Sequence, residues 1–126
     1  MSGWVSVLLR SLAVAGLLTV GLAPTAQAAG ALAIGACGAY GYSYDYRGVA
    51  VARKAAIGRC KGNCKIVSTM KRSCGALAID AGNACGAIGY ANAGRLGKAQ
   101  NMALRYCYRY GGKDCVIRAW ACDAKG

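Results

Sequence analysis

Eight cysteines are the residues of this chain best suited to chemistry. They stand at the following positions: Cys37, Cys60, Cys64, Cys74, Cys85, Cys107, Cys115 and Cys122. An even number of cysteines in a short chain is typical of a disulfide framework, although thiolate pairs also bind zinc. The chain has no histidine and no two cysteines separated by two residues, so we expect disulfides rather than a metal site.

Catalytic side chains are scarce. The chain has no histidine, no glutamate and four aspartates, which excludes a Ser-His-Asp or Cys-His centre and leaves few carboxylates for a glycosidase-type pair. Asp45 is placed to cap a helix and Asp114 to shape a turn. Asp80 and Asp123 then remain without assigned partners. We therefore expect a protein that is not an enzyme and that uses no cofactor.

The charge of the chain is strongly positive. Sixteen lysines and arginines against four aspartates give a net charge of +12, and it falls only to +11 if the first 28 residues, which contain Arg10, are removed. A field of this sign attracts anionic partners, such as acidic lipid head groups, teichoic-type polymers, nucleic acid or acidic proteins. Charge indicates the sign of the partner and not its identity.

Residues 1–28 have the three parts of a secretory signal peptide. Arg10 precedes a short apolar run from Leu12 to Leu22, Pro24 interrupts it, and Ala26–Ala28 fits a small-x-small cleavage site. The run is too short for a bilayer, which needs roughly 20 residues. We expect cleavage near Ala28 and a product that is not an integral membrane protein. It would be secreted, or held in the periplasm or cell envelope.

The rest of the chain contains two copies of one unit. Gly30–Ile34 recurs as Gly75–Ile79, and Ala36–Tyr42 recurs with one substitution as Ala84–Tyr90. Three later cysteines match in the same order, Cys60 with Cys107, Cys64 with Cys115 and Cys74 with Cys122. A repeat of this length indicates a duplicated supersecondary unit. We expect one domain over residues 29–126, with copies at about 30–74 and 75–122.

Each copy predicts the order strand, strand, helix, strand. The third segment has apolar residues at helical spacing, namely Val49, Ala52, Ala56 and Cys60 in copy one and Leu96, Ala99, Ala103 and Cys107 in copy two. Asp45 and Asn92 stand near the helix starts as potential caps, and residues 64–69 and 115–120 are typical of strands. The prediction is an α+β fold in which two tandem strand-strand-helix-strand repeats pack as one pseudo-symmetric, disulfide-stapled domain. Its helices would cover one face of an antiparallel or mixed sheet.

The repeat also orders the possible disulfides. We expect Cys60–Cys64 and Cys107–Cys115, which would tie each helix end to the next strand. The other four cysteines have two alternatives. They could join equivalent positions, as Cys37–Cys85 and Cys74–Cys122, and so lock the copies together, or they could close within copies, as Cys37–Cys74 and Cys85–Cys122.

Comparison of the copies separates packing from candidate binding residues. Four tyrosines alternate along one strand, at positions Tyr40, Tyr42, Tyr44 and Tyr46, and alternation places them on one face. Copy two also has large side chains at the positions equivalent to the first two tyrosines, which indicates that these two tyrosines pack in the core. It has Ala91 and Ala93 opposite the other two at the helix offset. We therefore expect Tyr44 and Tyr46 to make an exposed contact.

Two basic groups are likewise present in only one copy. Arg47, Lys54 and Lys61 recur every seven residues along the first helical segment. The second group runs off the end of the second helix and contains Arg105, Tyr108, Arg109 and Tyr110. Alternating arginine and tyrosine can bind anionic polymers through charge and stacking. These residues, with Tyr44 and Tyr46, form the predicted binding set.

Several motifs together resemble one bacterial family. They are the Gly-Ala-Leu-Ala openings, Tyr-Gly-Tyr-Ser-Tyr-Asp-Tyr at 40–46, a helix that ends in cysteine, Cys-Lys-Ile-Val at 64–67, Ser-Cys-Gly-Ala-Leu-Ala at 73–78 and Ala-Trp-Ala-Cys at 119–122. Over residues 30–122 the chain resembles the DUF4189 family of small secreted bacterial proteins, of mycobacterial type. The resemblance implies a small secreted domain with a duplicated unit and no established activity, and it brings no catalytic residues. This chain adds Cys37 and Cys85 to the family pattern.

The leading hypothesis is a secreted, disulfide-stabilised basic binding or effector module. It would engage an anionic surface, an anionic polymer or an acidic protein without chemistry. The alternative is a secreted inhibitor of an acidic enzyme or toxin, which would form a one-to-one complex. A third class, a hydrolase or thiol oxidoreductase, would need a metal or free thiols, and Cys60 and Cys64 lack the usual two-residue spacing of redox motifs.

Overall fold

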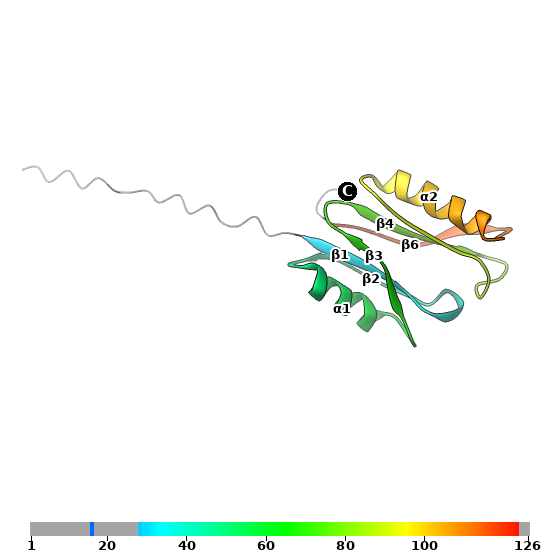
Figure 1. The fold of residues 1–126 in the computed structure, drawn as a ribbon, viewed down its shortest axis with the longest axis horizontal. Helices are drawn as coiled ribbons and strands as arrows, with labels where there is room; N and C mark the ends of the chain where they lie inside the picture. The colour runs from blue at the N-terminus through cyan, green and yellow to red at the C-terminus, as the bar shows by residue number, and fades with distance from the viewer. Residues whose placement is uncertain (1–15, 17–27, 124–126) are drawn as a thin grey trace, which may run out of the picture.

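Four layers make up the computed structural model, which describes Gly16 and residues 28–123 (Figure 1). The first antiparallel sheet has the strand order β2-β1-β3, where β1 is Ala29–Ile34, β2 is Tyr40–Tyr46 and β3 is Lys65–Met70. Helix α1, Val49–Arg59, lies on its outer side, and a short 3₁₀ helix, η1, covers Ala36–Gly38. The predicted signal peptide lies outside the described residues, apart from Gly16 and Ala28.

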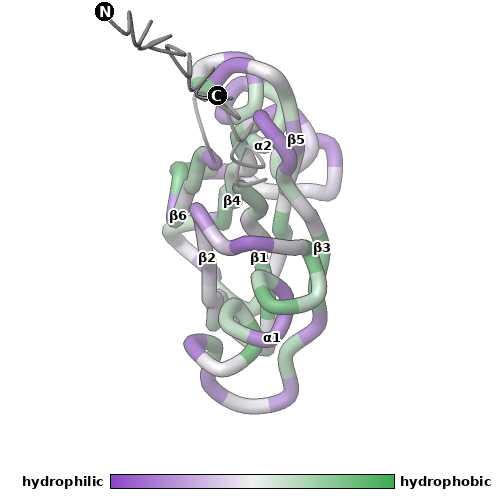
Figure 2. Tube along the Cα trace, turned by 90° about the vertical axis from the view of Figure 1, so that its left-hand side faces the viewer, coloured by the Kyte–Doolittle hydropathy of each residue, from purple (hydrophilic) through white to green (hydrophobic). Residues whose placement is uncertain are grey.

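The second copy builds a second sheet of the same design. Its strand order is β5-β4-β6, where β4 is Cys74–Asp80, β5 is Ile88–Ala93 and β6 is Cys115–Cys122. Helix α2, Leu96–Arg109, covers its outer side. The two sheets pack face to face, and the helices lie at opposite ends of the stack (Figures 1 and 2). The predicted α+β class and the strand-strand-helix-strand repeats are confirmed. The expectation that both helices cover one face of a single sheet is wrong, because each copy forms its own sheet and covers it with its own helix.

The side chains of the central strands β1 and β4 pack on both faces of their sheets. In β1, Ala31 and Ala33 pack toward α1, whereas Leu32 and Ile34 pack between the sheets. Strand β4 repeats this alternation, because side chains on a strand point to opposite faces in turn. Small residues therefore face the helix and large residues face the other sheet. The run Gly-Ala-Leu-Ala-Ile thus serves two cores at once.

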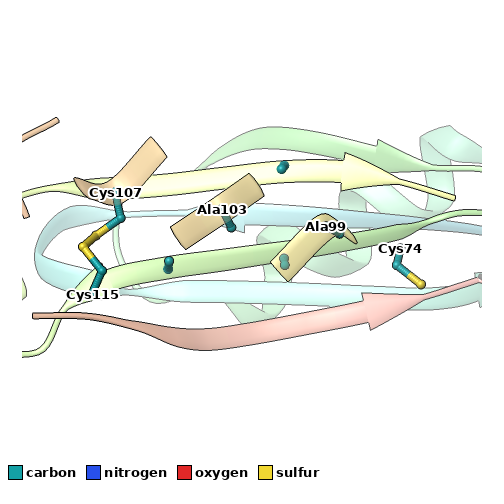
Figure 3. Close-up of a cluster of buried hydrophobic side chains, with 8 residues drawn as sticks. Cys74, Ala99, Ala103, Cys107 and Cys115 are labelled. Carbon is teal, nitrogen blue, oxygen red and sulfur yellow. A yellow bond between two sulfur atoms is a disulfide. The ribbon is translucent and has the colours of Figure 1, made fainter. Parts of the chain in front are cut away.

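Small residues also let each helix lie close to its sheet. Ala52 and Ala56 of α1 and Ala99 and Ala103 of α2 are fully buried. Figure 3 shows the second copy, where Ala99, Ala103 and Cys107 line the side of α2 that faces the sheet. The predicted helical stripes are therefore confirmed in both copies.

The two copies exchange equivalent contacts. Between the sheets, β2 packs against β6, and its equivalent β5 packs against β3. This reciprocal pattern is what a twofold axis between two copies produces. Cys74 is the first residue of β4, so it belongs to the second sheet rather than to the end of the first copy.

A β-bulge changes the match between the copies. Ala31 pairs with Ser43 as Ala76 pairs with Ala91, so Ser43 is the counterpart of Ala91. The expected match between Tyr44 and Ala91 is wrong by one residue, because β2 has one extra residue between Ser43 and Tyr46, opposite the stretch from Ala29 to Ala31 of β1. Tyr46 does match Ala93, since the two pair with Ala29 and Cys74.

The expected helix caps are also wrong. The N-cap residues of the described helices are Gly48 and Arg95, and neither side chain makes a cap hydrogen bond. Asp45 lies in β2 at φ 58°. The Asn92 Nδ2 atom instead donates to Ser68 Oγ at 3.2 Å and to the Thr69 carbonyl oxygen at 2.6 Å. Asn92 therefore joins the two sheets.

All eight cysteines form disulfides. Cys60–Cys64 and Cys107–Cys115 are present as expected, and each ties a helix end to the next strand. Of the two alternatives for the rest, the structure contains Cys37–Cys85 and Cys74–Cys122. Cys74 and Cys122 are opposite each other on neighbouring strands β4 and β6. Only Cys37–Cys85 therefore locks the copies together, and Cys74–Cys122 acts within the second sheet.

The carboxylate of Asp80 joins two turns of the second copy. Its oxygens accept hydrogen bonds from the backbone N–H of Gly82 at 2.9 Å and of Lys113 at 3.1 Å. These two bonds hold the pKa of Asp80 below its ordinary value of 3.8, and the bond from Lys113 has the larger effect. They lower the pKa because they stabilise the ionised form.

The lowered pKa of Asp80 predicts a loss of stability in acid. A carboxyl whose pKa is lower in the folded state stabilises the protein above the unfolded-state pKa, and this stabilisation disappears as the pH falls through the folded pKa. We expect the free energy of unfolding to decrease between about pH 5 and pH 2, and Asp80→Asn to make this decrease shallower. Urea titrations at a series of pH values measure both slopes. Equal slopes in the two proteins would contradict the assignment.

Candidate binding grooves

Three tyrosines form a row on the side of β2 that faces the second sheet. The ring centroids of Tyr40 and Tyr42 are 6.3 Å apart with planes 9° from parallel, and those of Tyr42 and Tyr44 are 6.3 Å apart at 15°. Alternate residues of a strand share a face, so the sequence dictates this row. The three residues are called the tyrosine row below.

Tyr46 does not belong to the tyrosine row. The bulge in β2 turns it toward α1, where the Arg59 guanidinium lies 5.9 Å from the centroid of its ring. Arg59 Nη2 also donates to Tyr46 Oη at 3.2 Å. The expectation that four tyrosines share one face is therefore wrong by one. Tyr46 helps to hold Arg59 rather than extending the exposed row.

A groove of about 500 Å³ lies beside the tyrosine row. Its other wall comes from β6, over residues 118–122. Arg118 places its guanidinium 5.5 Å from the centroid of the Tyr40 ring. Tyr44 is 51% exposed and Trp120 is 50% exposed. This β2–β6 groove is within the size range of small-ligand sites, and it opens to solvent.

Positive charge flanks the tyrosine row on two sides. Arg118 approaches from β6, and Arg59 approaches from α1, where its Nη1 atom donates to the Tyr42 carbonyl oxygen at 2.9 Å. These two guanidinium groups favour an anionic group beside the tyrosine row.

A second groove occupies the equivalent place between β3 and β5. It has a volume of about 420 Å³ and is lined by Val67, Ser68, Tyr90, Ala91, Asn92, Met102, Tyr106 and Tyr110. Val67 takes the place of Arg118, since Ser68 and Ala119 both pair with equivalent leucines. Asn92 takes the place that Tyr44 has in the other copy, and it bridges the sheets through its bond to the Thr69 carbonyl oxygen. The β3–β5 groove therefore has no cationic side chain on β3 at the position that Arg118 occupies on β6.

The aromatic-basic group of α2 divides between two sides of that helix. Tyr106 stacks on Tyr110 with centroids 6.5 Å apart, and the Arg109 guanidinium lies 5.5 Å from the Tyr106 ring. The Tyr108 hydroxyl instead donates to the Cys115 carbonyl oxygen at 3.5 Å. Arg105 is exposed. Tyr110 therefore lines the β3–β5 groove, while Tyr108 lies beside β6.

The predicted binding set does not form one surface. Arg47, Lys54 and Lys61 are exposed around α1, but only Lys54 is within the helix, which runs from Val49 to Arg59. The group on α2 lies on the opposite outer layer (Figures 1 and 2). Within the predicted set, Tyr44 alone lines the β2–β6 groove.

Sequence reasoning missed Arg59, Arg118 and Trp120. The comparison of copies contained a signal for two of them. At the offset between Cys64 and Cys115, Arg118 stands opposite Val67 and Trp120 opposite Thr69. The same test that selected Tyr44 would have selected both residues on β6.

The remaining carboxylates and cysteines are engaged in structural bonds. Asp80 and Asp123 accept hydrogen bonds from backbone N–H groups of turns. Within residues 28–123 there is no group of three or more side chains that could hold a metal ion. In the same part of the chain, no helix is both long and apolar enough to cross a membrane.

These features define a small, duplicated α+β domain with four disulfides and two exposed aromatic grooves. The chain belongs to the DUF4189 family, a domain of unknown function, whose family model matches residues 29–122. No curated protein and no solved structure matches the chain.

Proposed function

We propose that this domain is a secreted, non-catalytic module that binds an anionic partner in the β2–β6 groove. The observation that carries the proposal is the tyrosine row with Arg118 on one side and Arg59 on the other. Four disulfides support export, because disulfides persist in oxidising compartments. The strongly positive net charge, which is +11 once residues 1–28 are removed, would raise the local concentration of such a partner.

Binding assays with groove variants test this proposal. We expect Arg118→Gln and Tyr44→Ala each to weaken binding of an anionic polymer about tenfold, since one charged or stacking contact is worth about 1–3 kcal/mol. Polyphosphate, an acidic polysaccharide and single-stranded DNA serve as probes. Titrations at about 0.15 M salt reduce the contribution of distant charges, which are screened beyond about 8 Å.

Matched controls separate the groove from the overall charge. Tyr108 is 51% exposed, as Tyr44 is, but lies outside the groove, so Tyr108→Ala should leave binding unchanged. Arg53→Gln removes an equal charge from the exposed surface of α1. If Arg118→Gln and Arg53→Gln weaken binding equally, the attraction is a diffuse field and the groove proposal fails.

The three basic residues predicted around α1 supply a further comparison. Replacing Arg47, Lys54 and Lys61 together by glutamine removes three exposed charges. We expect this triple variant to reduce the salt dependence of binding and to leave thermal stability unchanged. A saturable one-to-one complex with an acidic protein, with no binding to polymers, would favour the inhibitor alternative.

A further inference from the structure

One disulfide differs from the other three in position and exposure. Both residues of Cys37–Cys85 are exposed, whereas every other pair includes at least one buried cysteine. It is also the pair that joins the two copies, since each of the others connects elements of one copy. Exposed disulfides are the ones open to thiol exchange.

The disulfide lies where two equivalent loops meet. Cys37 is in η1, between β1 and β2, and Cys85 is in the turn between β4 and β5. A Cβ atom added to Gly38 would lie 3.5 Å from the Ala84 Cβ atom, so the loops are packed against each other. Each loop is also closed internally, by the bond from Gly35 N–H to the Ala39 carbonyl oxygen at 2.8 Å and by that from Gly86 N–H to Asn83 at 2.9 Å.

The backbone at Cys37 is in the left-handed region. Its φ is 54°, a conformation that L-residues other than glycine, asparagine and aspartate seldom adopt. The bond to Cys85 is therefore made from a residue whose backbone conformation is uncommon. Because the packed neighbours Gly38 and Ala84 remain, the two sulfur atoms would stay close after the bond is broken.

Cleavage would affect the β2–β6 groove directly. The copies are joined covalently at two places, the turn at residues 71–73 and Cys37–Cys85. The turn leads into the first residue of β4, whereas the disulfide lies beyond the last residues of β1 and β4. Tyr40 follows Cys37 by three residues and contacts Arg118 of the other copy. Breaking the disulfide would therefore remove the covalent restraint between the sheets at the Tyr40 end of the groove, and only the packing of the two loops would remain there.

We propose that Cys37–Cys85 is a reversible thiol-exchange site that takes a dithiol as reductant and controls the β2–β6 groove. A thiolate of the dithiol attacks one Sγ atom, the S–S bond breaks, and the other Sγ leaves and takes up a proton. The second thiolate of the dithiol then attacks the mixed disulfide and releases the second cysteine, which is also protonated. Two electrons pass to the protein, and the dithiol becomes a disulfide.

Stepwise reduction of the native protein tests the site. The oxidised protein is incubated with increasing dithiothreitol, the free thiols are alkylated, and the labelled peptides are identified by mass spectrometry. We expect Cys37 and Cys85 to be labelled together at about tenfold lower dithiothreitol than any other pair. Release of all four disulfides in a single step, or of another pair first, would overturn the proposal.

A second readout tests the link to the groove. Trp120 lines the groove and is the only tryptophan after Trp4, so its fluorescence in the processed protein should change at the same dithiothreitol concentration and recover on reoxidation. The double variant Cys37→Ser, Cys85→Ser should give the reduced spectrum without dithiothreitol. An unchanged spectrum in both experiments would refute control of the groove. Neither readout depends on a ligand, so they succeed or fail separately from the binding assays.

Discussion

Alanine at Gly41 is expected to lower the free energy of unfolding by about 3 kcal/mol, the upper end of the usual cost of overpacking. The added Cβ atom would run into the Ala56 carbonyl oxygen and lie 2.7 Å from the Cys60 backbone nitrogen. Both contacts are with helix backbone, which cannot rotate away as a side chain does. The helix cannot easily withdraw either, since Cys60–Cys64 ties its end to the first sheet. Urea unfolding with the disulfides intact measures the loss.

Replacing a glycine by alanine at an exposed helix position should instead raise the free energy of unfolding. Gly58 lies on the exposed side of α1 with no atom within 4 Å of an added Cβ, so Gly58→Ala should stabilise the helix by up to about 1 kcal/mol. Gly89 repeats the Gly41 contact in copy two, against Ala103 and Cys107, and its alanine variant should resemble Gly41→Ala. If Gly41→Ala is as stable as Gly58→Ala, the helices do not pack on the strands at backbone distance.

Asp123→Ala should also destabilise the protein by about 3 kcal/mol, because each hydrogen bond to a charged group contributes about 1.5–3 kcal/mol. The Asp123 side chain is fully buried. Its Oδ2 accepts from the Arg72 N–H at 2.8 Å, and its Oδ1 accepts from the Ser73 N–H at 3.0 Å. These two groups belong to the turn that links the copies, where Arg72 has φ 52°. Without the carboxylate, both N–H groups would be left without an acceptor.

Two variants test whether the Asp123 carboxylate is responsible. Asp123→Asn keeps the shape but offers an NH₂ group to one backbone donor, so it should recover little of the lost stability. Asp114→Ala is the matched control. The Asp114 side chain is exposed, and its backbone carbonyl, which the substitution keeps, accepts from Ala81 N–H at 2.8 Å. We expect Asp114→Ala to change stability by less than about 0.5 kcal/mol. Thermal unfolding that shows equal losses for Asp114→Ala and Asp123→Ala would contradict this role.

Local periodicity was sufficient for the elements and their order. The stripe of Ala52, Ala56 and Cys60 repeats at helical spacing, and its copy 47 residues later does the same. Such spacings depend only on the geometry of one helix or strand. The bonds Cys60–Cys64 and Cys107–Cys115 could also be predicted from the sequence, because each closes a short stretch between neighbouring elements.

The pairing of the other four cysteines could be decided only from the way in which the two copies pack. Cys37–Cys85 and Cys37–Cys74 were equally allowed by the spacing of the cysteines. The choice depends on which loops meet when the sheets pack, and no local pattern contains that information. Cys74 illustrates the same point. It stands at the end of the first repeat in the sequence, but in the structure it is the first residue of β4 and lies opposite Cys122 in the second sheet.

The candidate site depended most on tertiary structure. Alternation in the sequence places Tyr40, Tyr42 and Tyr44 on one face of a strand, but a bulge at Asp45 turns Tyr46 away. The other wall of the groove comes from β6, more than 70 residues later in the chain. Composition and repeats thus determine the charge, the elements and the duplication, because these follow from residues that are near one another along the chain. The groove exists only where edge strands from different copies face each other, and that contact is set by the packing of two whole sheets.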